Sequence, residues 1–210
     1  SNGQIEKEKN YKHGKDNGKR IIYYENGQLL EESYYIEGVR VDKTTSYYEN
    51  GQIRIEGKYI DGNVYMINYW NYDGDILVTN GNGKLIHYWE NGQIIEEENY
   101  KDGKRNGKST YYYKNGQIWS IGNYKGGEKV GKWTTYYEHG QIEFERNYKD
   151  GKEDGKYTSY YENGQIKREG NYKGVDEYGY EKSEGKSLWY YDNVQISEER
   201  NIKDDKVDGH

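Results

Sequence analysis

The 210-residue sequence has no cysteine, no proline and no long apolar run. Without cysteine no disulfide framework is possible. No window approaches the roughly 18 apolar residues of a membrane-spanning helix, and no secretory signal is present. The chain opens on Ser1-Asn2-Gly3-Gln4-Ile5, which is the middle of a repeat, so we expect a fragment or processed form. This start hides any signal peptide and leaves the compartment undetermined, with the cytoplasm slightly favoured.

Hydrophobic residues are scarce, at 31% of the chain, while 32% of residues are charged. Such polarity is typical of disorder, because too little apolar area is buried to offset chain entropy. The aromatic content of 16%, mostly from 28 regularly placed tyrosines, argues against disorder. We therefore expect a thin repetitive structure in which each unit buries a little surface against its neighbours. The net charge of -6 speaks against nucleic acid and gives no support to membrane association, which stays possible.

An internal repeat is the clearest feature of the sequence. The tripeptide Asn-Gly-Gln or a close variant begins at positions separated by 24, 24, 41, 24, 24, 24 and 30 residues, namely Asn2, Asn26, Asn50, Asn91, Asn115, His139, Asn163 and Asn193. Another turn is due within the interval of 41, at Asp73-Gly74-Asp75, and the interval of 30 contains a six-residue insertion. The prediction is one continuous array over residues 1–210, with a degenerate unit at about 60–86 and an insertion at about 175–183.

One unit, residues 131–149, has two β-rich runs around His139-Gly140. This pattern predicts a two-residue hairpin turn in which both central residues have positive φ. A glycine-spaced return turn is expected over residues 149–155. A parallel crossover needs roughly a dozen residues, which neither turn supplies. The predicted fold is therefore all-β, an elongated single-layer antiparallel sheet of tandem β-hairpin repeats of 24 residues.

The predicted register places Tyr137 opposite Ile142, Thr135 opposite Phe144 and Trp133 opposite Arg146, all on one face. Equivalent aromatic–aliphatic pairs are Tyr24/Leu29, Tyr48/Ile53, Trp89/Ile94, Tyr113/Ile118, Tyr161/Ile166 and Tyr191/Ile196. The opposite face is expected to carry a second tyrosine column beside a glutamate column. The tyrosines are Tyr23, Tyr47, Tyr88, Tyr112, Tyr136, Tyr160 and Tyr190, and the glutamates are Glu8, Glu56, Glu97, Glu145, Glu169 and Glu199.

The repeat unit Tyr160-Tyr161-Glu162-Asn163-Gly164-Gln165-Ile166, followed by Glu169 and Tyr172, resembles the bacterial MORN repeat variant. Proteins of this type are often labelled YwqK-family antitoxin components of toxin–antitoxin systems. The resemblance implies an elongated antiparallel sheet and a protein–protein or membrane-associated scaffold. Choline-binding and glucan-binding repeats are also short aromatic hairpins, but they are led by tryptophan. The spacing of 24 and the five tryptophans favour the MORN type.

The residue types that catalyse reactions or bind metals are not spaced as an active site or a metal site requires. The four histidines lack metal-ligand spacing, no nucleophile constellation appears, and the glutamate pairs recur in register as repeat architecture does. The predictions are no catalytic residue, no metal site and no cofactor. The partly exposed tyrosines Tyr112, Tyr136 and Tyr160 are the candidate binding surface. A local partner site is expected at Tyr65 and Trp70, in the most apolar departure from the repeat.

Two functions fit these features. The first is a non-enzymatic protein-binding or scaffolding repeat protein, with toxin neutralisation as a specific form and a protein as partner. The alternative is a carbohydrate or cell-wall-binding module of a surface protein, because aromatic rows also stack on sugars. Repeat arrays are scaffolds reused for many partners, so the repeat does not decide between the two.

Overall fold

The computed structural model describes residues 5–89, 91–175, 181–203 and 206–207. Over these residues the chain forms nineteen strands and no helix, which confirms the all-β class. The strands are β1 (Lys7–Lys12), β2 (Lys15–Tyr23), β3 (Leu29–Ile36), β4 (Val39–Tyr47), β5 (Ile53–Ile60), β6 (Asn63–Trp70), β7 (Ile76–Thr79), β8 (Asn82–Tyr88), β9 (Ile94–Lys101), β10 (Lys104–Tyr112), β11 (Ile118–Lys125), β12 (Glu128–Tyr136), β13 (Ile142–Lys149), β14 (Lys152–Tyr160), β15 (Ile166–Val175), β16 (Glu181–Ser183), β17 (Gly185–Tyr190), β18 (Ile196–Lys203) and β19 (Lys206–Val207).

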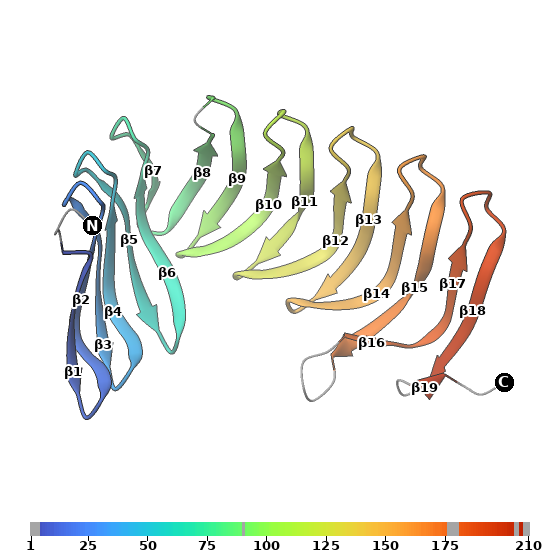
Figure 1. The fold of residues 1–210 in the computed structure, drawn as a ribbon, viewed down its shortest axis with the longest axis horizontal. Coiled ribbons are helices and arrows are strands. Elements are labelled where there is room, and N and C mark those ends of the chain that lie inside the picture. The colour runs from blue at the N-terminus through green and yellow to red at the C-terminus, as the bar shows by residue number, and fades with distance from the viewer. Residues whose placement is uncertain (1–4, 90, 176–180, 204–205, 208–210) are drawn as a thin grey trace. The chain divides into compact units, whose positions relative to one another are not determined.

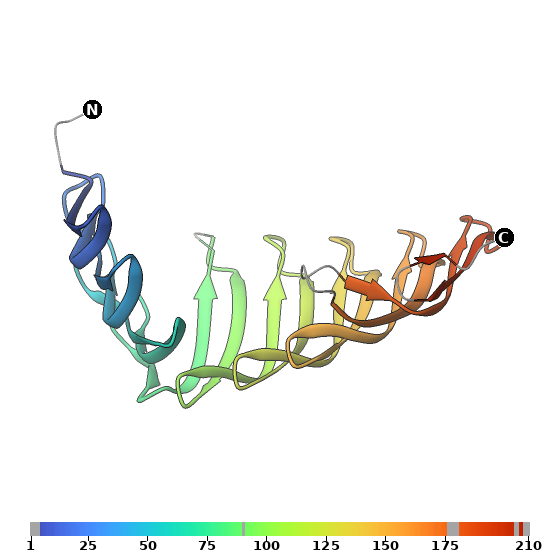
Figure 2. The ribbon, with the colours of Figure 1, turned by 90° about the horizontal axis from the view of Figure 1, so that it is seen from below.

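The chain divides into two compact units. Unit 1 contains Ser1–Leu85 and Asn99–Arg105, and unit 2 contains Ile86–Glu98 and Asn106–His210. Within each unit, strands that follow one another pair antiparallel, as tandem hairpins require (Figure 1). Figure 2 shows the same hairpins from a second direction. In the part of the chain described, no helix is long and apolar enough to cross a membrane.

Some predicted features fall outside the described residues. The expected turn at residues 2–4, the centre of the insertion at residues 176–180 and His210 belong to this group. The irregular stretch at 60–86 is described, and it forms strands. A turn with the usual pair of backbone hydrogen bonds lies there, because Asn71 N–H donates to the carbonyl of Asp75 (2.9 Å) and Gly74 N–H donates to that of Asn71 (3.1 Å).

The Asn-Gly turns differ from the prediction. In the turn after β12, Tyr137 N–H donates to the Gln141 carbonyl and Gly140 N–H donates to the Tyr137 carbonyl, both over 2.8 Å. Gly140 has φ 93°, whereas His139 does not adopt positive φ. This is a three-residue loop in which a type I turn is followed by a left-handed glycine. The expected two-residue turn instead lies at the other end of the hairpin, where Asp150 and Gly151 have φ 50° and 78°.

The three-residue loop also shifts the strand register next to the turn away from the predicted one. Trp133 faces Arg146 and Thr135 faces Phe144 as predicted, but Tyr136 faces Ile142, so the pairing of Tyr137 with Ile142 was wrong. The bulge between Thr135 and Tyr136 causes this one-residue shift. The same shift replaces other predicted pairs by Tyr23/Leu29, Tyr47/Ile53, Tyr112/Ile118, Tyr160/Ile166 and Tyr190/Ile196.

Each unit has a different buried centre. In unit 1, Tyr69, Val78 and Leu85 form an apolar cluster with exposed fractions of 1%, 0% and 2%. In unit 2, the fully buried ring is Tyr157, and Trp133 is 4% exposed. A single layer of hairpins buries few side chains completely, so these residues anchor the sheet in their respective units.

Candidate functional site

One face of the sheet carries lysine, glutamate and tyrosine side chains in a repeated arrangement, and we call it the Lys–Glu–Tyr face. In unit 2, the Glu145 carboxylate accepts a hydrogen bond from the Tyr160 hydroxyl (3.3 Å) and forms an ion pair with Lys132. Glu169 is bound in the same way by Tyr190 (2.7 Å) and Lys156 (3.1 Å). The tyrosine column therefore lies beside the glutamate column, as predicted.

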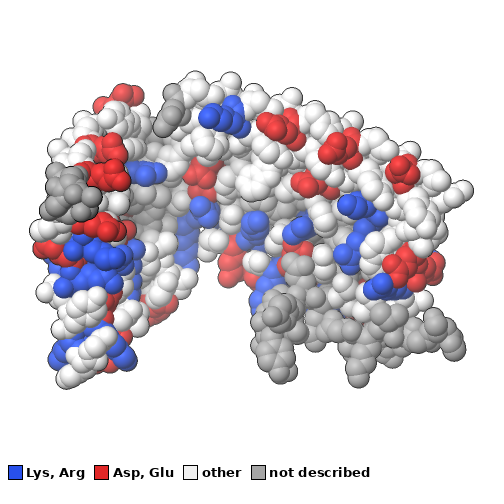
Figure 3. Space-filling model, viewed as in Figure 1, with Lys and Arg blue, Asp and Glu red and all other residues white. Residues whose placement is uncertain are grey.

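Unit 1 repeats this arrangement. The Glu32 carboxylate receives Lys19 (2.6 Å) and the Tyr47 hydroxyl (3.4 Å). Glu56 receives Lys43 (2.8 Å), but Asn68 stands where a tyrosine would bind it. Figure 3 shows basic and acidic side chains lying next to one another on the molecular surface. Alternating charges of this kind do not create a patch of one sign.

Protonation equilibria follow these contacts. The hydrogen bond from Tyr190 lowers the pKa of the Glu169 carboxyl, and Lys156 adds to this effect. The same bond raises the pKa of the Tyr190 phenol. Both shifts favour a charged carboxylate that accepts from a neutral phenol. The face thus presents fixed donors and acceptors at neutral pH.

In the regular repeats, the second of the two tyrosines before the turn links one repeat to the next. In unit 2, the Tyr113 hydroxyl donates to the Tyr136 carbonyl (2.7 Å) and the Tyr137 hydroxyl to the Tyr160 carbonyl (2.8 Å). The Tyr161 hydroxyl continues the series to the Tyr190 carbonyl (2.8 Å). We call this series the hydroxyl–carbonyl ladder. The tyrosines that were predicted to face isoleucine, such as Tyr113 and Tyr137, therefore hold neighbouring hairpins in register instead.

The opposite face is lined by aromatic rings and arginines, and we call it the aromatic–arginine face. Tyr157 stacks on Tyr172 with 4.3 Å between the ring centroids. The Arg168 guanidinium lies 4.9 Å from the centroid of Tyr157 and 4.8 Å from that of Trp189. Cation–π contacts of this kind replace much of the hydrocarbon that the sequence lacks.

Two interior glycines of this face give the aromatic rings room. A Cβ at Gly122 would overlap the Trp133 indole, and one at Gly170 would lie 2.7 Å from the Tyr157 hydroxyl oxygen. Neither glycine has positive φ, so close approach of a ring accounts for both.

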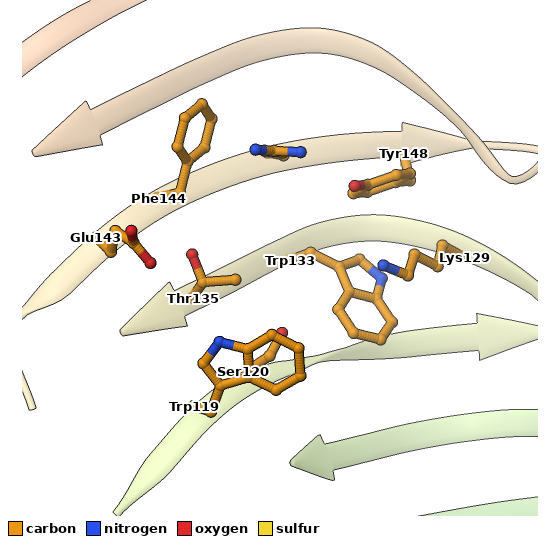
Figure 4. A pocket seen from close by; sticks show the side chains of 9 residues that line it. Trp119, Ser120, Lys129, Trp133, Thr135, Glu143, Phe144 and Tyr148 are labelled. Atoms are coloured by element: carbon orange, nitrogen blue, oxygen red, sulfur yellow. The ribbon is translucent and has the colours of Figure 1, made fainter. Parts of the chain in front are cut away.

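A hollow of about 310 Å³ opens on the aromatic–arginine face (Figure 4). Trp119 is 47% exposed at its edge, and Trp133 lies across from it. The Lys129 ammonium lies 4.3 Å from the Trp133 ring centroid and 5.1 Å from that of Tyr148. The Lys129 ammonium already occupies the space between the Trp133 and Tyr148 rings. The hollow therefore offers exposed rings and not an empty cation site.

A buried carboxylate adjoins that hollow. Glu153, 4% exposed, accepts hydrogen bonds from Arg146 (2.6 Å) and from the Tyr148 hydroxyl (2.9 Å). Burial, together with this hydrogen bond, raises the pKa of Tyr148 to about 12. Sequence reasoning missed Glu153, because it lies outside the regular glutamate column. Its position five residues after Tyr148, just past the Asp150-Gly151 turn, gives no signal of burial.

The predicted binding residues separate into two groups. Tyr112, Tyr136 and Tyr160 lie in unit 2 on the Lys–Glu–Tyr face, and each is half-buried. Tyr65 and Trp70 lie in unit 1, on β6. The Lys104 ammonium covers the Tyr65 ring at 4.7 Å, and the Trp70 carbonyl accepts the Tyr48 hydroxyl (2.9 Å). The structure therefore offers two separate candidate surfaces.

Over the described residues, no group of three or more histidine and acidic side chains could hold an ion. His87 lies 2.7 Å from Glu96, and His139 stacks on Tyr137 within the turn. The Nε2 atom of His139 lies 3.2 Å from the Glu162 carbonyl oxygen. In the preceding repeat the Asn115 side-chain amide makes the equivalent contact with the Glu138 carbonyl.

A family model matches this pattern of hairpins directly. The model of the MORN repeat variant matches residues 16–37, 43–61, 81–102, 105–125, 129–150 and 153–173, more than half of the chain. The chain belongs to the MORN repeat variant family. Repeats of this family are generally non-enzymatic and are commonly protein- or membrane-binding modules. No curated protein sequence matches the chain significantly.

Solved structures add little to this assignment. "Crystal Structure of TcdB2-TccC3-Cdc42" is 11% identical over 92% of this chain and 13% of that chain, with a TM-score of 0.22. "Crystal Structure of TcdB2-TccC3" is 11% identical over 92% of this chain and 14% of that chain, with a TM-score of 0.17. The MORN chain thus spans about an eighth of the length of these much larger chains. Scores this low carry no argument about fold or function.

Proposed function

We propose that this MORN repeat chain is a non-enzymatic protein-binding module whose contact surface is the Lys–Glu–Tyr face of unit 2. The observation that carries the proposal is the column of Tyr112, Tyr136 and Tyr160, half-buried rings 24 residues apart in the sequence. Tyr136 borders a hollow of about 340 Å³, and Tyr112 borders one of about 400 Å³. Such recesses beside fixed rings suit the side chains of a partner protein.

Rigid tyrosines make good contact residues for a physical reason. A ring already held by its neighbours loses little conformational entropy on binding, and its hydroxyl adds directional specificity. Tyr160 is held in this way by Glu145. The mixed charge of the face favours a partner with matching donors and acceptors over a uniformly charged polymer such as nucleic acid.

A more specific form of this function is neutralisation of a toxin. Its support is the similarity of the repeat to the antitoxin components described above. Tyr65 and Trp70 of unit 1 are a second contact surface under the same proposal, because they lie in the stretch of β6 that departs most from the repeat.

The test is affinity capture from lysate and envelope fractions of the source cell. The bait is the whole chain, and the comparison is its Tyr112→Ser, Tyr136→Ser, Tyr160→Ser triple variant. We expect one protein to be retained by the wild type and lost with the triple variant. The matched triple phenylalanine variant keeps the rings and removes only the hydroxyls, so it should retain part of the capture. Circular dichroism of all three chains checks that the sheet is intact.

Two outcomes would contradict the proposal. Equal capture by the serine variant would remove the tyrosine column from the contact surface. Recovery of polysaccharide or wall fragments in place of a protein would favour a carbohydrate-binding module, in which exposed rings such as Trp119 stack on sugars.

A further inference from the structure

A one-residue bulge follows the glycine turn in each of the hairpins β10–β11, β12–β13 and β14–β15. The strand register moves by one residue there and leaves Trp119, Glu143 and Lys167 without a cross-strand partner. A bulge re-aims its side chain relative to the alternation of the strand. Trp119 and Glu143 accordingly line one end of the hollow on the aromatic–arginine face, and Lys129 lies at the other end (Figure 4). We call the three bulge residues the bulge column, and all of them belong to unit 2.

The chemistry of the bulge column changes from repeat to repeat, although its surroundings do not. The three residues that precede each member of the column are Gly-Gln-Ile in every case. The member itself carries an indole, then a carboxylate, then an ammonium group. The backbone therefore fixes where this side chain lies, and the hairpin does not require one residue type at the position.

The bulge column is open to a partner, and its charges are not neutralised within the chain. Trp119 is 47% exposed, Lys167 is exposed and Glu143 is half-buried. Lys167 lies 5.5 Å from the centroid of the Tyr161 ring, but within the described part of the chain neither Lys167 nor Glu143 forms an ion pair. Glutamates of the Lys–Glu–Tyr face, such as Glu145, are by contrast paired with lysines. One negative and one positive charge of the column are thus left for opposite charges on a partner.

The spacing of the bulge column suits one kind of extended chain. Its members lie on β11, β13 and β15, so one strand separates each from the next. Neighbouring strands are about 4.8 Å apart, which places the members at intervals of about 9.6 Å. A polyproline II helix advances about 9.3 Å in three residues and returns every third side chain to the same face. An α-helix advances about 10.5 Å in seven residues, so it falls out of step by about 1.8 Å over two intervals.

We propose that the bulge column binds a polyproline II segment of a protein partner, which lies across the strands with a proline at Trp119, a basic residue at Glu143 and an acidic residue at Lys167. The proline ring packs on the exposed indole, and the two charged residues form ion pairs with the column. A segment that already has the polyproline II conformation loses little conformational entropy on binding. This inference goes beyond the proposed function, because it assigns a second contact surface on the opposite face of the sheet.

An exchange of charges tests the assignment. The probe is a fluorescein-labelled peptide with proline, lysine and glutamate at every third position and proline or serine between them. It is made in both chain directions, because either direction presents the same three side chains to the column. A second probe has its lysine and glutamate exchanged, and binding of both probes to the whole chain is followed by fluorescence anisotropy.

The wild type should prefer the first probe by roughly tenfold, since the second places like charges together at two positions. The double variant Glu143→Lys, Lys167→Glu should prefer the second probe instead. The matched control is the double variant Lys125→Glu, Glu128→Lys, which exchanges two exposed charges at the other end of a hairpin. This control keeps the net charge of the wild type and should keep its preference for the first probe.

Two further measurements report on single members of the column. Trp119→Ala should weaken binding of the first probe by roughly tenfold or more, the scale of a central aromatic contact. In a chain with nitrogen-15-labelled tryptophan, the Trp119 indole signal should move when the first probe is added. If the double variant of Glu143 and Lys167 does not fold, Lys167→Glu alone changes an exposed side chain and should remove most of the preference between the two probes.

Several results would overturn the inference. Absence of binding of the first probe to the wild type in both chain directions would do so, and so would a preference that the double variant does not reverse. Self-association of the wild type that Glu143→Lys abolishes would assign the column to a second copy of the chain. The peptide assay does not use the partner sought by affinity capture, so the failure of one proposal leaves the other standing.

Discussion

The irregular stretch of unit 1 and the regular repeats of unit 2 solve the same problem with different chemistry. The family model leaves residues 62–80 unmatched, and the apolar cluster takes Tyr69 and Val78 from this stretch and Leu85 from the start of the next matched repeat. In the matched repeats 129–150 and 153–173, the centre is a stack of rings and guanidinium groups around Tyr157. Both stretches nevertheless keep the same pair of backbone hydrogen bonds in their turns.

This difference separates what the repeat requires from what it tolerates. The turns position the strands, and either kind of packing can then cover the backbone. Hydrocarbon packing is non-directional and accepts exchange of shape, whereas ring stacking and cation–π contacts depend on orientation. The regular repeats should therefore be more sensitive to substitutions that preserve volume but remove a ring.

The largest effect that tests this contrast is expected at the two buried centres. Tyr157→Ala should lower the free energy of unfolding by about 3–5 kcal/mol, and Leu85→Ala by about 2–5 kcal/mol, as measured in urea. The informative pair is Tyr157→Leu and Leu85→Met, which keep apolar bulk. Leu85→Met should cost less than about 1.5 kcal/mol, and Tyr157→Leu should cost clearly more. Equal costs for the two would break the comparison.

An intermediate effect should appear at alkaline pH, because the stack of unit 2 contains a phenol bound to a buried carboxylate. The folded pKa of Tyr148, at about 12, lies above its ordinary value of 10.0. The folded state therefore holds this proton more tightly, and the resulting stability is present below pH 10 and is lost as the pH rises toward 12. The loss should be about 1–2 kcal/mol, after allowance for the partial exposure of the ring.

Urea unfolding between pH 9 and pH 12 measures this loss, with Tyr148→Phe as the matched variant. The variant should have a smaller decline of stability over this range, although other tyrosines still titrate. A decline as steep as in the wild type would show that Tyr148 makes no contribution to this loss.

The smallest effect concerns the turns, the feature that both stretches share. Gly116 has φ 86°, and an added Cβ would overlap Oε1 of Gln93 from the preceding turn. Gly92 has φ 80° but no atom within 4 Å of such a Cβ among the described residues. Gly116→Val should therefore destabilise its hairpin by about 1–3 kcal/mol, with faster hydrogen exchange over residues 110–120. Gly92→Val should cost about as much, because the end of the Gln93 side chain can move aside and leaves the backbone strain common to both variants. Unchanged exchange in Gly116→Val would contradict the turn geometry.

Much of the fold could be predicted because turn chemistry is local. Asn-Gly and Asp-Gly mark the chain reversals, and their spacing excludes helices and parallel crossovers. The type of turn could not be predicted, because Asn-Gly suits both a two-residue loop and a three-residue loop with a left-handed glycine. That difference of one residue exchanged the roles of Tyr136 and Tyr137. It moved the candidate tyrosines to the position opposite isoleucine.

The candidate site was predictable only where it repeats. Glu145 and Tyr160 appeared as columns at constant spacing, so their proximity followed from the period. On the aromatic–arginine face, the pairing of Trp133 with Arg146 followed from the predicted register. The contacts of Arg168 with Tyr157 and Trp189 did not appear, because the arginines follow no constant register relative to the turns. Glu153 and Gly122 have roles that only neighbouring strands define, and a sequence pattern confined to one repeat does not contain them.

The hydroxyl–carbonyl ladder gives the array a direction. Each of these repeats supplies a hydroxyl donor to the repeat that follows and a carbonyl acceptor to the repeat that precedes it, so two neighbouring repeats cannot exchange places without loss of a bond. Every such link spans one period, so duplication or loss of a whole unit by recombination restores all of them at the junction. Insertion of a partial repeat breaks one of these hydroxyl–carbonyl links. Array length can therefore drift during evolution in whole repeats, while the order of head and tail is conserved.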